Sequence, residues 1–139
     1  MITLKKNRIS VSEYLDIRKK VNWRTLLPAQ AELALKNSLL VVGAYDGDCL
    51  VGMGRIVGDG AVICYVQDLI VAPDFQHCGI GSMVLDELIS YVDSLKMVNS
   101  QMMLCLMCAK GREGFYSKHG FVARPTDSLG PGMIQYLYG

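Results

Sequence analysis

The sequence predicts a single α/β (α+β) domain in which one mixed sheet is flanked by helices on both faces. The chain has 139 residues, which is enough for one core but too short for two comfortable ones. Segments with the two-residue period of strands alternate with segments that have the 3.6-residue period of helices. Their order, β-α-α-β-β-β-α-β-α-β-β, is typical of a sheet covered on both sides. We therefore expect one domain over residues 1–139.

The first elements are a short strand and two helices. Residues 2–4 favour a strand, and the stretch Ser10-Val11-Ser12-Glu13 has the spacing of a capping box. We expect the helix that starts there to run to about Val21. Pro28 stands where a proline commonly begins a helix, and residues 29–36 are strong helix formers.

The middle of the chain predicts three antiparallel strands in succession. Residues 38–45 are apolar and rich in valine, and residues 49–57 alternate in character. The Asp-Gly-Asp sequence at 46–48 joins them as a hairpin turn. A second turn, Gly-Asp-Gly at 58–60, leads into residues 61–71, which form the longest β-like run of the chain and end shortly before a proline.

The last elements begin with an amphipathic helix over residues 79–95, whose apolar side chains fall on one stripe. Residues 102–108 favour another strand, and residues 111–118 favour a short helix that ends at a glycine. Two closing strands are predicted at 121–123 and 133–138.

Composition narrows the function classes. Lys and Arg number 14 against 13 Asp and Glu, which gives no broad charge for nucleic acid or a membrane surface. No apolar stretch approaches the roughly 20 residues that span a bilayer, and the basic N-terminus is followed by no apolar signal region, so we expect a cytoplasmic protein. The five cysteines form an odd set, and most lie in predicted strands among apolar neighbours, which predicts reduced, buried thiols. No second Cys or His pair stands at ligand spacing, so no metal site is expected.

The stretch APDFQHCGIG, residues 72–81, stands at the start of the amphipathic helix. Helix N-termini expose unpaired amides and the positive end of the dipole, and glycines let oxygens approach them, so Gly79 and Gly81 predict an anion cradle. Glycines that serve packing alone are the competing interpretation. A Walker loop is excluded because no lysine follows Gly81, and a dinucleotide fingerprint is excluded because Val84 replaces its third glycine.

Two motifs together carry a family resemblance. Val71-Ala72-Pro73 followed by QHCGIG at 76–81 resembles the coenzyme A loop of the GNAT superfamily of N-acetyltransferases, Gln/Arg-x-x-Gly-x-Gly/Ala after a strand ending in Val-x-Pro. The stretch GFYSKHGF at 114–121 resembles the second signature of that family. The resemblance covers most of the chain and points to its short, single-domain bacterial-type members. It implies a sheet splayed between strands four and five, and transfer of an acetyl group from acetyl-CoA to an amine by direct attack, with no metal.

The resemblance also implies which residues bind the coenzyme. The amides of the loop would surround its pyrophosphate, and those of the preceding strand would follow the pantetheine arm. The residues expected to do so are Leu69, Ile70, Val71, Gln76, His77, Cys78, Gly79, Ile80, Gly81 and Ser82. His77 and Cys78 would serve through their backbone, and the amide of Leu69 would in addition stabilise the oxyanion.

Acyl transfer also needs a neutral amine and a proton for the departing thiolate. Tyr116 matches the tyrosine that many family members aim at the coenzyme sulfur, with core packing as the alternative role. Many members carry a glutamate four residues before the oxyanion position, where this chain has Tyr65. Asp68 is therefore one candidate base, beside a water chain or an amine that arrives neutral.

The acceptor is expected to be an amine of a small molecule or peptide. Trp23 and Arg24 lie between the first two predicted helices, where the family builds its acceptor pocket, although a lone tryptophan more often packs in a core. Two other functions stay open: a catalytically degenerate module that binds acyl-CoA for regulation, and a structural protein without coenzyme. The apolar strand at 133–138 could pair across a homodimer.

Overall fold

The computed structural model describes all of residues 1–139, which form two compact units, Met1–Leu106 and Met107–Gly139. The first unit contains the sheet and three of the four α-helices, and the second contains the remaining helix. The elements are β1 (Ile2–Lys6), α1 (Val11–Lys20), α2 (Pro28–Lys36), β2 (Leu40–Asp46), β3 (Cys49–Gly58), β4 (Ile63–Val71), the 3₁₀ turn η1 (Pro73–Phe75), α3 (Ile80–Leu95), β5 (Met103–Cys105) and α4 (Glu113–Lys118).

The sheet has five strands in the order β1-β2-β3-β4-β5. Strands β1 to β4 pair antiparallel with their neighbours, whereas β5 pairs parallel with β4. The predicted mixed sheet of an α+β fold is therefore confirmed. The β4–β5 ladder covers only residues 63–65 of β4, so β4 runs on through Val71 with no strand paired on that side.

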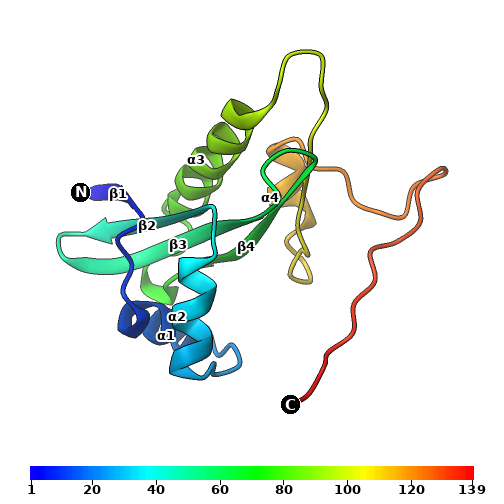
Figure 1. Ribbon diagram of the computed structural model, residues 1–139. Helices are drawn as coiled ribbons and strands as arrows, with labels where there is room; N and C mark the ends of the chain where they lie inside the picture. The colour runs from blue at the N-terminus through cyan, green and yellow to red at the C-terminus, as the bar shows by residue number, and fades with distance from the viewer. The chain divides into compact units, whose positions relative to one another are not determined.

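Helices cover both faces of this sheet (Figure 1). Met53 of β3 belongs to the cluster that α1 and α2 bury, together with Tyr14, Ile17, Ala31, Tyr45, Leu50 and Ile70. The neighbouring Gly54 faces α3 instead, because side chains alternate across a strand. A Cβ atom on Gly54 would lie 2.7 Å from Leu88 of α3. Glycine at this position thus lets α3 pack closely on the sheet.

The two predicted helix starts in the first unit are confirmed. Ser10 Oγ accepts from the backbone N–H of Glu13 at 3.1 Å, and Ser10 N–H donates to the Glu13 carboxylate at 2.9 Å, which completes the capping box. Helix α1 ends at Lys20, with Val21 as its C-cap. Helix α2 begins at Pro28.

The β3–β4 turn is held by Asp59. One of its carboxylate oxygens accepts from the backbone N–H groups of Ala61 and Val62 at 2.8 Å and of Ile63 at 3.0 Å. These bonds to Ile63, Ala61 and Val62 hold the pKa of Asp59 below its ordinary value. Because Ala61 and Val62 direct their N–H groups to this carboxylate, β4 starts at Ile63, two residues later than predicted.

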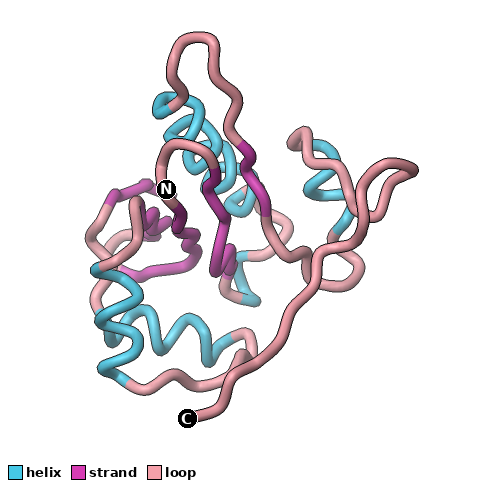
Figure 2. Tube along the Cα trace, turned by 45° about the vertical axis from the view of Figure 1, so that its right-hand side comes forward, coloured by secondary structure: helices cyan, strands magenta, loops and turns pink.

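The end of the chain differs from the prediction. The strand predicted at 102–108 is limited to Met103–Cys105, and the closing strands predicted at 121–123 and 133–138 are absent. From the end of α4 to the C-terminus the trace is drawn as loop (Figure 2). Apolar alternation favours a strand, but a strand also needs a paired neighbour, and neither segment has one here.

None of the helices combines the length and the apolar character needed to cross a membrane. All five cysteines are free thiols, but only Cys64 is fully buried, whereas Cys49, Cys78 and Cys108 are exposed. The expectation that most thiols would be buried is therefore wrong.

Candidate functional site

Strand β4 carries a β-bulge near its end. Arg55 of β3 pairs with Gln67, and Met53 pairs with Ile70. Two steps along β3 thus match three steps along β4, which places one extra residue in β4. Asp68 lies at this point with φ of +55°, in the left-handed region. Nothing in the run of side chains indicated this bulge.

The Asp68 side chain is fully buried and faces α1. Its carboxylate accepts from Arg18 at 2.7 Å and from Arg55 at 2.8 Å, and the hydroxyl of Tyr14 donates to it as well. Gln67 adds a longer bond of 3.3 Å. Burial and then the Asp68 charge raise the pKa of Tyr14 above its ordinary value, so the hydroxyl remains a donor. All contacts of the Asp68 carboxylate are internal, and its side chain is 0% exposed.

Beyond the bulge, β4 directs part of its backbone to the side where no strand pairs. Ala72 N–H donates to Val51 O of β3 at 2.8 Å. Because successive amides of an extended strand point to opposite edges, the N–H groups of Val71 and Leu69 point away from β3. The carbonyl of Val71 agrees with this direction, since it accepts from the Gln76 side chain at 3.1 Å.

The loop after β4 leads directly into α3. Its residues His77 and Gly79 have φ values of +64° and +83°, and Gly79 is the N-cap of α3 without any side-chain hydrogen bond. The first bond of the helix runs from Met83 N–H to the Gly79 carbonyl at 3.1 Å. The amides of Ile80 and Gly81 precede this bond and lie at the positive end of the helix dipole.

The ten residues predicted to bind coenzyme lie along this continuous stretch. His77, Cys78 and Gly79 are exposed, whereas Gln76, Gly81 and Ser82 are half-buried. Leu69 is half-buried on the α3 face. Two members point inward: Ile70 belongs to the core on the α1 face, and Ile80 is buried between α3 and the sheet. Only their backbone could contribute to a site.

The second motif forms the C-terminal end of α4 in the other unit. Gly120 has φ of +90°, its N–H donates to Ser117 O at 3.1 Å, and Phe121 N–H donates to Tyr116 O at 3.2 Å. This pair of bonds is a Schellman motif, which commonly brings two apolar side chains together. Tyr116 and Phe121 make that contact, edge to face with ring centroids 5.9 Å apart.

Trp23 and Arg24 lie in the turn between α1 and α2. Trp23 is 38% exposed, and the Arg18 guanidinium carbon lies 5.4 Å from its ring centroid. Arg18 also donates to the Arg24 carbonyl at 3.0 Å. The predicted acceptor residues are thus connected to Asp68 through a single side chain.

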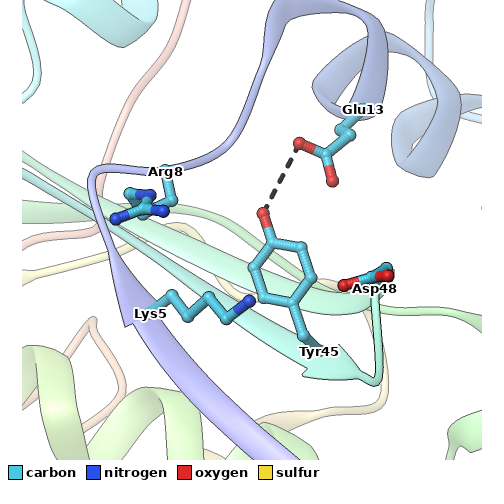
Figure 3. A pocket seen from close by; sticks show the side chains of 5 residues that line it. All are labelled: Lys5, Arg8, Glu13, Tyr45 and Asp48. Carbon is cyan, nitrogen blue, oxygen red and sulfur yellow. Dashed lines mark hydrogen bonds between the residues drawn. The ribbon is translucent and has the colours of Figure 1, made fainter.

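A shallow pocket lies elsewhere, lined by Lys5, Arg8, Glu13, Tyr45 and Asp48 (Figure 3). Lys5 lies 4.8 Å from the Tyr45 ring centroid, and the Tyr45 hydroxyl donates to Glu13 at 3.5 Å. Burial and then the Glu13 charge raise the pKa of Tyr45 to about 12. Since Glu13 also serves the capping box, we interpret this pocket as structural. No three His, Cys, Asp or Glu side chains are arranged to hold a metal ion.

The partners of Asp68 were not predicted from the sequence. Tyr14 and Arg18 are four residues apart on α1, so they share one face of that helix. Arg55 stands inside an otherwise apolar strand. The sequence does contain a signal for this network. Asp68 and Arg55 are charged residues within neighbouring apolar strands, and Tyr14 and Arg18 form a polar pair on one helix face.

Comparison with known proteins gives a consistent result. Residues 37–123 match the family model described as an acetyltransferase (GNAT) domain. The chain is 33% identical over 109 residues to the GCN5-related N-acetyltransferase 1, chloroplastic, of Arabidopsis thaliana, which covers 77% of this chain and 53% of that protein. It is 26% identical over 126 residues to the uncharacterized N-acetyltransferase ycf52 of Pyropia yezoensis, covering 88% of this chain and 70% of that protein.

Solved structures of acetyltransferases are also similar to this chain. A GNAT family acetyltransferase from Streptococcus pneumoniae superposes with a TM-score of 0.83 at 33% identity over the full length of both chains. A protein of unknown function from methicillin-resistant Staphylococcus aureus, named a probable acetyltransferase, gives a TM-score of 0.86 at 27% identity and covers 98% of this chain and all of that one.

Proposed function

Because more than half of the chain matches the family model, it belongs to the GNAT acetyltransferase family, and on that premise we propose that it transfers an acetyl group from acetyl-CoA to an amine. The acceptor class is a small molecule or a peptide, as it is for this family generally. One observation carries the proposal. The bulged strand β4 has amides at an edge where no strand pairs, and it leads directly into the start of α3, where Gly79 is the N-cap.

The loop at 76–82 would hold the pyrophosphate of acetyl-CoA. A Cβ atom on Gly79 would meet nothing within 4 Å, and its φ of +83° lies in the left-handed region at the start of α3. Main-chain N–H groups at a helix N-terminus bind such anions without a charged side chain. Bound acetyl-CoA would supply the activated acyl group.

Leu69 and Val71 would act through their backbone. Their N–H groups point to the edge of β4 that lacks a paired strand, so an extended ligand can add there as a strand does. Leu69 follows the bulge immediately, and its N–H would stabilise the oxyanion that forms when the amine attacks. Ile70 would contribute only packing, since its side chain is in the core.

Proton transfers complete the reaction. Tyr116 would donate a proton to the departing thiolate. We do not assign Asp68 as the base, because its carboxylate is occupied by two guanidinium groups and a tyrosine hydroxyl inside the protein. An ammonium acceptor would first lose a proton to a water chain, or the amine would arrive neutral. After attack the nitrogen would lose one more proton as the amide forms, and water would accept it while Tyr116 regains the proton that it gave to the thiolate.

A variant tests the role of Tyr116. Tyr116→Phe keeps the edge-to-face packing but removes the hydroxyl, so we expect kcat to fall by about 10²-fold or more, the size of a general acid contribution, while the Kd for coenzyme A stays unchanged. Steady-state kinetics and calorimetric titration measure the two quantities. A wild-type kcat in this variant would rule out the acid role.

Two assays separate the competing functions. An enzyme releases free thiol from acetyl-CoA when an amine panel is added, which a thiol-reactive dye detects. A regulatory acyl-CoA-binding module shows no release but is stabilised by coenzyme A, by about 2.7 kcal/mol at 100 times the Kd. A structural protein shows neither effect, and that result would overturn the proposal.

Location and assembly are part of the same proposal. We keep the cytoplasm as the expected location, although one relative is named as chloroplastic. We also keep pairing of two copies through the exposed apolar segment at 133–138 as the expected mode of a homodimer.

A further inference from the structure

We propose that Asp68, held by Arg18 and Arg55, is a positioning residue that sets the β4 bulge and links it to the turn carrying Trp23 and Arg24. This inference rests on the proposed function, because it assigns the bulge amide and the turn to one reaction. The residues act through others and need not touch the reacting atoms.

Burying the charges of Asp68, Arg18 and Arg55 costs free energy. Asp68 is 0% exposed, and the side chains of Arg18 and Arg55 are 10% and 12% exposed. Buried ion pairs stabilise a fold less than well-packed apolar residues of the same volume. The Nε of Arg18 is also buried without a hydrogen-bond partner. Stability alone therefore gives a poor reason for three charges here, whereas fixed geometry gives a good one.

Asp68 is covalently connected to the proposed oxyanion donor, the N–H of Leu69. Asp68 adopts φ of +55°, a conformation that non-glycine residues rarely take without support. Its carboxylate is fixed by α1 on one side and by β3 on the other. The peptide unit between Asp68 and Leu69 carries the N–H of Leu69. Fixing Asp68 thus fixes the direction of that N–H.

Arg18 makes a forked contact that joins Asp68 to the turn between α1 and α2. One terminal nitrogen donates to Asp68 at 2.7 Å, and the other donates to the Arg24 carbonyl at 3.0 Å. The same guanidinium lies 5.4 Å from the Trp23 ring centroid. Only a planar, forked group can make all three contacts at once. Arg18 therefore holds the acceptor turn at a set position relative to the bulge.

The central variant is Asp68→Asn, which keeps the shape and removes the charge. Its matched control is Glu87→Gln, the same carboxylate-to-amide change in the Lys6–Glu87 ion pair, which is 2.9 Å long and partly exposed. Losing an oxyanion donor altogether lowers kcat by about 10²- to 10³-fold. Asp68→Asn only misdirects that donor, so we expect it to lower kcat by a part of this, at least about tenfold. The Kd for coenzyme A should stay the same, and Glu87→Gln should change neither.

A second variant separates the contact of Arg18 with Asp68 from its contact with the Arg24 carbonyl. Arg18→Lys keeps one charged donor for Asp68 but cannot also hold the Arg24 carbonyl, so we expect a KM for the amine raised at least about fivefold with kcat nearly unchanged. Emission of the single tryptophan should also shift, because Trp23 loses its guanidinium neighbour. Arg55→Lys leaves the turn untouched and should leave both the KM for the amine and the emission unchanged.

A readout without turnover keeps this test apart from the proposed function. In protein labelled with ¹⁵N-leucine, Leu69→Met identifies the amide signal of Leu69. We expect Asp68→Asn to move that signal in the folded protein by more than it does in the urea-unfolded chain, where only the change of the neighbouring residue acts, and Glu87→Gln to leave it. If the wild type neither binds coenzyme A nor releases thiol, the proposed function is wrong, yet a displaced Leu69 signal still supports the positioning role.

Tyr14→Phe serves if Asp68→Asn does not fold. It removes one donor to Asp68 and keeps the ring in the core, so we expect a folded protein with a smaller displacement of the Leu69 signal in the same direction. An unmoved Leu69 signal and a wild-type kcat in folded Asp68→Asn, or in Tyr14→Phe when that variant replaces it, would overturn the inference.

Discussion

At the scale of single residues, backbone conformation separates glycines that look alike in the sequence. Gly79 and Gly114 both stand near the start of a helix, and a Cβ atom on either would meet nothing within 4 Å. They differ in φ, because only Gly79 lies in the left-handed region, at +83°. Any cost of a side chain at Gly79 is therefore conformational and not steric.

Gly79→Ala should destabilise the protein by about 1–2 kcal/mol, the cost of a left-handed L-residue. The matched variant Gly114→Ala should instead be neutral or stabilise by up to about 1 kcal/mol, because alanine favours a helix. Urea unfolding of both variants measures the difference. Equal effects of the two substitutions would contradict the assigned role of the backbone at Gly79.

Tyr45 predicts how stability depends on pH in the alkaline range. Its pKa of about 12 in the folded protein exceeds the ordinary value of 10.0. Between these values the unfolded chain has lost the proton while the folded protein keeps it, so stability must fall as pH rises from 10 to about 12. Tyr45→Phe should weaken this fall, and Tyr136→Phe, at an exposed site, should not. Urea midpoints at pH 8 and 10.5 provide the comparison.

At the scale of elements, one carboxylate determines where the longest hairpin turns. Asp59 accepts from the backbone N–H groups of Ala61, Val62 and Ile63, and β4 starts at Ile63. Because the charged form makes these bonds, the pKa of Asp59 is lowered. Its contribution to stability is present above the unfolded pKa near 4 and is lost as pH falls through the folded value.

Two substitutions at Asp59 separate hydrogen bonding from charge. Asp59→Asn keeps an acceptor oxygen, whereas Asp59→Ala removes it, so at pH 7 we expect Tm to fall in the order wild type, Asp59→Asn, Asp59→Ala. At pH 3, which is below the unfolded pKa near 4, the advantage of the wild type over Asp59→Asn should be smaller, because part of the contribution of the charged carboxylate to stability is then lost. Calorimetry at the two pH values tests this order, and an alanine variant as stable as wild type would contradict it.

The elements also show which parts of the fold the sequence could predict. The capping box at Ser10 and the proline at the start of α2 are local signals, and both helices start as predicted. The bulge at Asp68 is a relation between strands and leaves no mark on the period of the side chains. The closing strands were predicted from apolar alternation alone, which says nothing about a pairing partner.

At the scale of the whole molecule, the family and fold followed from two short motifs, whereas the Asp68 network did not. The motifs lie in contiguous stretches, and one glycine of each, Gly79 and Gly120, has a positive φ value, whereas Gly81 and Gly114 lie inside helices. The network joins Asp68 to Tyr14 and Arg18, which lie 54 and 50 positions earlier in the sequence, and only the folded chain brings them together.

The unpaired end of the chain predicts where a protease cuts first. Tyr136, Leu137 and Tyr138 are exposed and lie outside any helix or strand, so we expect chymotrypsin to cleave residues 119–139 before the sheet. Mass spectrometry identifies the first cuts. Protection of residues 119–139 that grows with protein concentration would indicate pairing between copies. First cuts within β2 or β3 would contradict the expectation that the sheet resists cleavage longer.

The exposed thiol in the loop before α3 gives the molecule a chemical reporter at the place where a diphosphate is expected. A small alkylating reagent reaches Cys78 and Cys49 from solvent, but it does not reach Cys64 inside the sheet. A ligand bound to the loop would slow the alkylation of Cys78 and leave the rate at Cys49 unchanged. The rate of alkylation at these two positions therefore reads ligand binding directly, without an acceptor amine and without turnover.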